Sequence, residues 1–250
     1  MVASPVRPEE ILTLDRLEAS YWWHVGRRSV IRALIESFAS LRPGARILDV
    51  GCCTGRNVAL LSAFGQAFGA DRSLEALRVA RSRGLDGRLV SAAAEGLPFR
   101  EAAFDLVAVL DVFEHLEDDV AGMAEIRRVL APQGVLLAAV PAYRFLWSEH
   151  DEALGHRRRY MASELHQKLN RAGFSVIKRS YAITFALPLI LAFRVWRGLF
   201  PPAGPLRSSY VTLPAWLNSA FAGLLSFEAS IMRGMNLPIG TSIFVVARRA

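Results

Sequence analysis

The stretch RILDVGCCTGRN, residues 46–57, decides the fold of this chain. A short apolar run ends in an acid, a turn bounded by Gly51 and Gly55 follows, and a helical pattern then begins. In an open α/β sheet, ligands collect outside the carboxyl ends of the parallel strands, and glycines let the backbone approach them closely. The stretch therefore predicts a strand whose carboxyl end contacts a nucleotide-type ligand.

Strand-like and helix-like runs alternate outward from this stretch, which predicts a parallel, doubly wound α/β sheet. We expect strands at residues 46–50, 67–70, 87–91, 105–110, 135–140, 174–180 and 242–247. We expect helices at residues 57–64, 74–83, 118–130 and 163–172, with a turn at APQG, residues 131–134. Residues 1–41 form an N-terminal helical cap, and residues 42–250 form the sheet domain.

Composition bounds the class of protein. The 250 residues can bury one α/β core with added segments, and they are 52% hydrophobic. A net charge of +7 suits nucleic acid, an anionic membrane surface or an acidic substrate, and charge alone does not choose among them. The two cysteines are neighbours that cannot form an ordinary disulfide, so we expect a reducing compartment, and the first residues do not predict a signal peptide.

The glycine-bounded loop resembles the cofactor site of class I S-adenosylmethionine-dependent methyltransferases, and its type 11, ubiquinone-methyltransferase-like branch in particular. The likeness does not depend on one glycine motif, because Asp71 ends the next apolar run 22 residues after Asp49. The resemblance implies a Rossmann-like sheet of seven strands with an antiparallel last strand, and S-adenosylmethionine as the cofactor. A nicotinamide-dinucleotide fold is the alternative, but its G-x-G-x-x-G spacing is missing here.

The resemblance also assigns cofactor-binding residues. Asp49 orders the loop and reaches the cofactor's amino group, and Asp71 accepts hydrogen bonds from the ribose hydroxyls. The backbone at Ala94 borders the adenine. The remaining cofactor-binding candidates are Gly51, Cys53 and Gly55 in the loop and Asp111 at the edge of the cleft. Cys53 stands where the family has its middle glycine, and a degenerate scaffold that only binds the cofactor therefore stays open.

On the acceptor side, three histidines are candidate catalytic bases: His115 after the fourth strand, and His150 and His156 after the fifth. Candidate acceptor-binding residues are Tyr143, Arg157, Arg158 and Tyr160, since guanidinium groups bind phosphate or carboxylate. The alternative is a solvated, salt-bridged loop. Residues 111–115, DVFEH, resemble a metal-associated motif of ubiquinone-pathway O-methyltransferases, which makes Asp111, Glu114 and His115 metal candidates of magnesium or manganese type. Metal use is not favoured, because Glu114 and His115 equally fit a helix cap.

Two further segments bear on the acceptor. Trp23, Arg27 and Arg28 of the cap are candidate acceptor-binding residues, and the arginines are expected on a basic rim. Residues 182–239 form an insertion between the last two strands, with apolar helices at 183–200 and 213–235. Charges interrupt both helices, so the sequence favours a helical hairpin lying in a membrane interface over a spanning pair. The alternative is a hairpin packed on its own domain or on a second subunit.

These features predict a cytoplasmic, peripheral methyltransferase at the inner face of the cell membrane. It methylates a lipophilic small molecule, and oxygen is favoured as the acceptor atom. The alternatives are a soluble sugar or natural product as acceptor, with the hairpin as a lid or dimer interface, and an RNA methyltransferase. Nucleic acid is not favoured, because the sequence shows no appended RNA-binding module and its aromatic residues lie largely within apolar helices. The oligomeric state stays open.

Overall fold

The computed structural model of the chain describes residues 8–199, 211 and 213–250. The strands are β1 (Arg46–Val50), β2 (Gln66–Asp71), β3 (Leu89–Ser91), β4 (Phe104–Leu110), β5 (Leu130–Pro141), β6 (Phe174–Ala182) and β7 (Ser242–Arg249). The helices are α1 (Pro8–Ser20), α2 (Trp22–Phe38), α3 (Arg56–Leu61), α4 (Leu74–Arg81), α5 (Asp119–Val129), α6 (Glu149–Ala153), α7 (Ala162–Arg171), α8 (Ala186–Leu199) and α9 (Ala215–Met232), with a 3-10 turn, η1 (Arg144–Leu146).

The seven strands form one sheet in the order β3-β2-β1-β4-β5-β7-β6. Strands β1 to β5 pair in parallel, and β7 runs antiparallel to both β5 and β6. The strand order reverses between β1 and β4, so a ligand crevice is expected outside the carboxyl ends of these two strands. The expected doubly wound sheet with an antiparallel last strand is confirmed.

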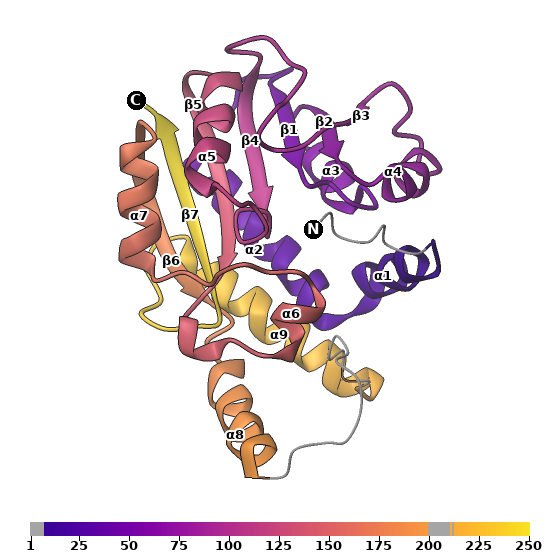
Figure 1. Cartoon of the computed structure of the whole chain (residues 1–250), viewed down its shortest axis with the longest axis vertical. Coiled ribbons are helices and arrows are strands. Elements are labelled where there is room, and N and C mark those ends of the chain that lie inside the picture. Colours follow the sequence, from indigo (N-terminus) through magenta and orange to yellow (C-terminus); the bar gives the residue numbers. More distant parts are fainter. Residues whose placement is uncertain (1–7, 200–210, 212) are drawn as a thin grey trace.

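Helices cover both faces of the sheet (Figure 1). On one face, α5 and α7 bury Met123, Ile126 and Leu165 against the strands. On the other face, α2, α3, α4 and α9 form a second apolar core that includes Ile31 and Leu225. The sequence pattern of alternating strands and helices predicted this layering, because the central strands β1 and β4 bury both of their sides.

One predicted turn lies inside a strand. APQG, residues 131–134, is part of β5, which begins at Leu130, five residues before the predicted start. Gln133 has a φ of 61°, and the pairing of β5 with β4 shifts register between Phe104 and Leu106. The turn residues are therefore accommodated as an irregularity of the strand rather than as a connection before it.

Within the described residues, the insertion packs on its own domain, mainly through its second helix. Helix α9 lies along α2, where Leu225 and Met232 are fully buried, and the Ser29 and Ser226 hydroxyl oxygens lie 2.9 Å apart. Helix α8 starts beside α9, with the Phe185 and Phe221 rings 5.5 Å apart, and then extends away from the sheet (Figure 1). The predicted hairpin connection and Phe200 lie outside the described residues.

A buried acid fixes the entry into α8. The Glu228 carboxylate of α9 accepts hydrogen bonds from the backbone N–H groups of Ile183, Thr184 and Phe185, at 2.6, 2.8 and 3.1 Å. An acid that interrupts an apolar helix in the sequence is therefore a structural anchor inside the protein. Among the described residues, no helix is both long and apolar enough to cross a membrane.

Candidate active site

A cleft of about 240 Å³ opens at the carboxyl ends of β1 to β4, at the point where the strand order reverses. Its lining comes from the loops after these four strands. The lining residues are Val50, Gly51, Asp71, Arg72, Ala92, Ala94, Asp111, Val112, His115 and Leu116. Sequence reasoning placed Gly51, Asp71, Ala94, Asp111 and His115 beside a ligand cleft, and the structure brings these five together.

The two glycines of the loop are required for different reasons. Gly51 has a φ of 74°, and a Cβ there would lie 2.4 Å from the Val112 side chain, so only glycine fits at the cleft wall. Gly55 has a φ of 80°, but its hypothetical Cβ meets Ala80 and Leu85, which belong to the helical layer. Gly55 therefore serves the packing of α4 rather than an approach to the ligand, and it is not part of the cleft lining.

Cys53 holds a left-handed backbone conformation with a φ of 45°, which is uncommon for a residue that is not glycine. Its backbone N–H donates to Asp71 Oδ2 at 2.8 Å, and Asp71 Oδ1 accepts from the Ser73 N–H at 2.8 Å. The Asp71 carboxylate thus fixes the loop after β1 and the start of α4. Burial raises the pKa of the Cys53 thiol, so this side chain is an unreactive part of the loop.

Asp49 is the buried acid of β1. Only 1% of its surface is exposed, and neither carboxylate oxygen has a hydrogen-bond partner among the described residues. Burial, and then the nearby Asp71 and Glu18, raise the pKa of Asp49 well above its ordinary value. An orphaned carboxylate behind a ligand cleft is suited to a cationic group of the ligand.

Arg27 is not on a basic rim, as the sequence led us to expect, but is buried between α2 and the sheet. One guanidinium N–H donates to Asp111 at the end of β4, and the guanidinium carbon lies 4.2 Å from the centroid of the Trp23 ring. Its Nε and Nη2 atoms have no partner among the described residues. Trp23 therefore supports Arg27, and Asp111 is already paired on the cleft side.

The cap closes over the glycine loop through polar contacts. Thr54 donates a hydrogen bond to Glu18, and Asp15 pairs with Arg56 and Arg83. Arg28, also expected on the rim, donates to the Glu18 carbonyl at 2.7 Å. Sequence reasoning missed these contacts, because they join α1 to residues far along the chain. We conclude that α1 fixes the glycine loop through hydrogen bonds and ion pairs in addition to covering it.

His24 lies in a hollow of about 20 Å³ beside this loop, lined also by Arg27, Arg28 and Arg56. Burial, and then these three cations, lower the pKa of His24 to about 3. Below pH 6.5 this histidine is protonated in the unfolded chain, whereas in the folded protein it stays neutral down to about pH 3. Stability is therefore lost as the pH falls through this range.

We expect the free energy of unfolding to fall by about 2 kcal/mol more between pH 7 and pH 5 in the wild type than in a His24→Phe variant. Thermal and urea unfolding at pH 7, 6 and 5 measure this difference. A His166→Phe variant should keep the slope of the wild type, because His166 lies on α7 and is not part of the hollow around His24. Equal slopes for all three proteins would show that His24 titrates freely.

The imidazoles of His115 and His156 meet beside the cleft, with ring centroids 4.8 Å apart. Glu114 completes the group, and the ligand atoms of the three side chains lie within 4.8 Å of one another. Burial, and then Asp111, raise the pKa of Glu114, while burial and His156 lower the pKa of His115. Of the three predicted bases, His115 and His156 come together, whereas His150 on α6 is not part of the cleft lining.

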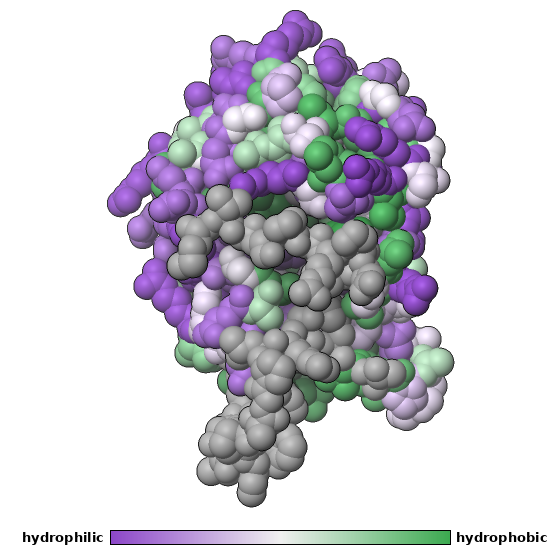
Figure 2. Space-filling view, turned by 45° about the vertical axis from the view of Figure 1, so that its right-hand side comes forward, coloured by the Kyte–Doolittle hydropathy of each residue, from purple (hydrophilic) through white to green (hydrophobic). Residues whose placement is uncertain are grey.

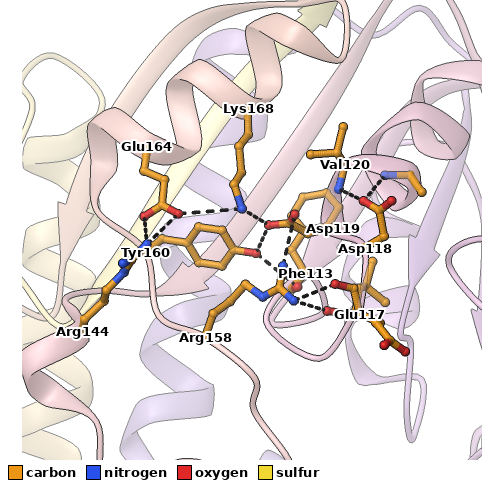
Figure 3. A network of polar contacts seen from close by, with 12 residues as sticks. Phe113, Glu117, Asp118, Asp119, Val120, Arg144, Arg158, Tyr160, Glu164 and Lys168 are labelled. Atoms are coloured by element: carbon orange, nitrogen blue, oxygen red, sulfur yellow. Dashed lines mark hydrogen bonds and ion pairs between the residues drawn. The ribbon is translucent and has the colours of Figure 1, made fainter.

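Tyr160 is not an acceptor-binding residue, because it is fully buried. Its hydroxyl oxygen lies 2.7 Å from Asp119 Oδ2 and 3.1 Å from the Phe113 carbonyl oxygen (Figure 3). Arg158 donates to the carbonyls of Leu116 and Glu117, each at 2.8 Å, so its guanidinium does not reach toward the cleft either. This network joins the loop after β5 to the loop after β4.

The other two predicted acceptor residues also lie apart from the cleft lining. Tyr143 is buried in a stack between Phe145 and Tyr181, with ring centroids 5.0 and 5.1 Å away. Arg157 is exposed, and its backbone N–H donates to the Glu114 carbonyl at 2.8 Å. The loop after β5 is held by ion pairs, as the alternative interpretation of a salt-bridged loop expected. Its central pair, Arg159 with Asp151, is buried rather than solvated.

Comparison with known proteins agrees with this geometry. Residues 48–138 match a family model described as a methyltransferase domain. The chain is 34% identical over 159 residues to an uncharacterized protein of Mycobacterium tuberculosis, covering 60% of this chain and 52% of that protein. It is 36% identical over 110 residues to the ubiquinone/menaquinone biosynthesis C-methyltransferase of Paraburkholderia phytofirmans, covering 40% and 44%. The chain thus spans about half the length of the curated relatives it matches.

Two solved structures show the same fold. A chain from the complex between the Haloferax volcanii Trm112 methyltransferase activator and the putative methyltransferase superposes with a TM-score of 0.61 and 19% identity, covering 94% of this chain and 92% of that chain. Phosphoethanolamine N-methyltransferase 2 of Haemonchus contortus, in complex with S-adenosyl-L-methionine, gives a TM-score of 0.63 and 19% identity, covering 97% and 57%.

Residues 48–138 thus belong to a methyltransferase domain, and the sheet around them has the fold of class I S-adenosylmethionine-dependent methyltransferases. Within this class, the matched domain is of type 11. The resemblance noted from the sequence is confirmed, and so is S-adenosylmethionine as the cofactor of this class of fold.

Proposed function

We propose that the protein transfers a methyl group from S-adenosylmethionine to an oxygen of a lipophilic small molecule at a membrane surface. The choice of an oxygen as the acceptor atom rests on one observation. The imidazole of His115 lines the same cleft as Gly51 and Asp71, so a base adjoins the position expected for the cofactor. A hydroxyl acceptor must lose its proton when it is methylated, and histidine suits this role near neutral pH.

The residues of the cleft fit the charges of the cofactor. S-adenosylmethionine carries an ammonium and a carboxylate group on its amino-acid tail, and the buried, unpaired groups beside the glycine loop are complementary to them. Asp49 is assigned to the ammonium group, and the free N–H groups of Arg27 to the carboxylate. Asp71 is assigned to the ribose hydroxyls and the backbone at Ala94 to the adenine. When bound, the cofactor supplies an electrophilic methyl group.

The apolar surface of the insertion supports the lipophilic acceptor. Trp216 and Phe227 of α9 are 72% and 64% exposed, and Leu189 of α8 is 55% exposed. Figure 2 shows hydrophobic residues at the surface low on this face, along its right-hand side and in its upper half, where hydrophilic residues surround them. Large exposed apolar side chains on neighbouring helices are typical of a lipid or protein contact. A soluble acceptor, with α8 in a lid or a dimer interface, is the competing proposal.

We expect a double variant, Trp216→Gln with Phe227→Gln, to bind vesicles containing anionic lipid at least about tenfold more weakly than the wild type. Both side chains are exposed, so their replacement leaves the core intact. Flotation of the two proteins measures the difference. A matched variant, Leu12→Gln with Ile177→Gln, removes two exposed apolar side chains from other elements and should float like the wild type. Equal flotation of the α9 variant and the wild type would refute the membrane contact.

The acceptor itself is tested by labelling. The protein is incubated with methyl-labelled S-adenosylmethionine and cell extract, and the extract is then divided into lipid and aqueous phases. Label in the lipid phase supports the proposal and provides a product whose methylated atom mass spectrometry can identify. Label in the aqueous phase alone supports the soluble acceptor and a role for α8 in a lid or an interface.

A further inference from the structure

The side chains of Glu114, His115 and His156 form a cluster from two separate loops, one after β4 and one after β5. Their ligand atoms lie within 4.8 Å of one another, so small side-chain rotations suffice to place all three on one ion. Two imidazoles and one carboxylate are the ligands of one common class of catalytic zinc site, which leaves a position open for water or substrate. The cluster therefore has the composition of a transition-metal site.

Glu114 gives the first independent indication of a ligand. Its side chain is fully buried, and neither carboxylate oxygen has a hydrogen-bond partner in another of the described residues. A buried carboxylate without a partner is costly, and buried charges in proteins are normally paired or coordinate metals. Two cations lie near Glu114, but Arg27 pairs with Asp111 and Arg159 pairs with Asp151, and neither donates a hydrogen bond to the Glu114 carboxylate.

Each of the two histidine rings has a hydrogen-bond partner outside the cluster that orients it. His156 Nδ1 lies 2.9 Å from Asp151 Oδ1, and Asp151 is itself held by Arg159 at 2.7 Å. The carbonyl of Gly155 accepts a hydrogen bond from the His115 ring. Metal-binding histidines almost always donate their second ring N–H to a carboxylate or a backbone carbonyl, which fixes the ring and the tautomer. Both histidines have such a support, which leaves His156 Nε2 and the second His115 nitrogen for coordination.

We propose that Glu114, His115 and His156 bind one divalent transition-metal ion of the zinc class at the acceptor end of the cleft. This site differs from the metal candidates drawn from the sequence. Asp111 is paired with Arg27 and does not take part, and His156 supplies a second imidazole in its place. The second imidazole shifts the expected ion from magnesium to zinc. Because His115 lines the cleft, the open position faces an acceptor oxygen, and in this respect the inference rests on the proposed function. With the ion bound, His115 would act as a ligand, and the ion would promote loss of the hydroxyl proton in place of the free imidazole.

Metal titration of the full chain tests the site. The protein is freed of metal with a chelator and titrated with Zn²⁺ by calorimetry, and with Co²⁺, whose visible absorption reports its ligands. We expect one ion per chain in the wild type. His156→Ala and the isosteric Glu114→Gln should each weaken binding by at least about 100-fold, and Asp151→Asn by about 10–100-fold. His150→Ala removes a histidine from the same loop but not from the cluster, so it should bind like the wild type.

The proposal is overturned if the wild type binds no ion. It is also overturned if the Glu114 and His156 variants both bind the ion as tightly as the wild type. An equal loss in the His150 variant also overturns it. S-adenosylhomocysteine is titrated into the same metal-free preparations as a separate readout. If this cofactor product binds and the metal does not, the metal site fails alone; if the cofactor product does not bind, the proposed function fails whatever the metal does.

Discussion

Replacing Asp71 with alanine is expected to weaken the binding of S-adenosylhomocysteine by about 10²–10⁴-fold, to below what calorimetry detects. The carboxylate lines the cleft at the end of β2, where the ribose of the cofactor is placed. Hydrogen bonds to a charged group are worth about 1.5–3 kcal/mol each, and two would be lost. The substitution also frees the backbone N–H groups of Cys53 and Ser73, which loosens the glycine loop.

Two further variants separate these effects. Asp86→Ala removes an exposed acid from the loop before β3 and should leave the affinity within about twofold of the wild type, as expected for a surface substitution. Asp71→Asn keeps one acceptor oxygen and should give an intermediate affinity. Unchanged affinity of Asp71→Ala would mean that the ribose lies elsewhere in the cleft.

The second large effect is expected at His115. His115→Ala should lower turnover by about 10²–10⁴-fold, the usual contribution of a positioned acid or base, while the affinity for S-adenosylhomocysteine changes little. The lowered pKa of His115 keeps the ring neutral at pH 7, so the acidic limb of the wild-type rate profile should lie below pH 6.5. Turnover is measured with the labelled acceptor that the extract experiment provides.

His166→Ala, on α7, serves as the control for this experiment and should turn over like the wild type. Normal turnover of His115→Ala would remove this residue from the mechanism. A metal ligand at His115 gives the same loss of turnover as a general base, and the metal titration distinguishes the two, because only a ligand also changes the affinity for Zn²⁺. The two experiments together thus assign the role of the imidazole.

Sequence reasoning located the sheet well, because the central strands are continuous apolar runs that bury both sides. β1 occupies the residues that the sequence predicted, and β2, β4 and β7 differ by one or two residues at their ends. Helix ends and short elements were less predictable. The five-residue helix α6 and the three-residue turn η1 were not foreseen, because both are too short to show a helical period.

The residues that line the cleft at the ends of β1 to β3 were largely predictable from the sequence. Asp71, Gly51 and Ala94 follow successive strands, and the topology of a parallel sheet brings the ends of such strands to one edge. The acceptor half was not readable in the same way. Tyr160 and Arg158 are chemically suited to bind a substrate, but the structure uses both to join two loops. Only long-range packing decides whether a polar side chain faces the cleft or another part of the chain.

The sequence by itself determined the doubly wound fold and the edge of the sheet where a ligand cleft opens, and its resemblance to a known family implied the class of cofactor. The first two follow from local patterns whose physical basis is the period of strands and helices and the steric freedom of glycine. Tertiary structure alone decided that α9 belongs to the core, that Arg27 is buried against Asp111, and that His156 meets Glu114 and His115. Each is a contact between segments far apart in the chain, and such contacts depend on the packing of whole elements rather than on the residues beside them.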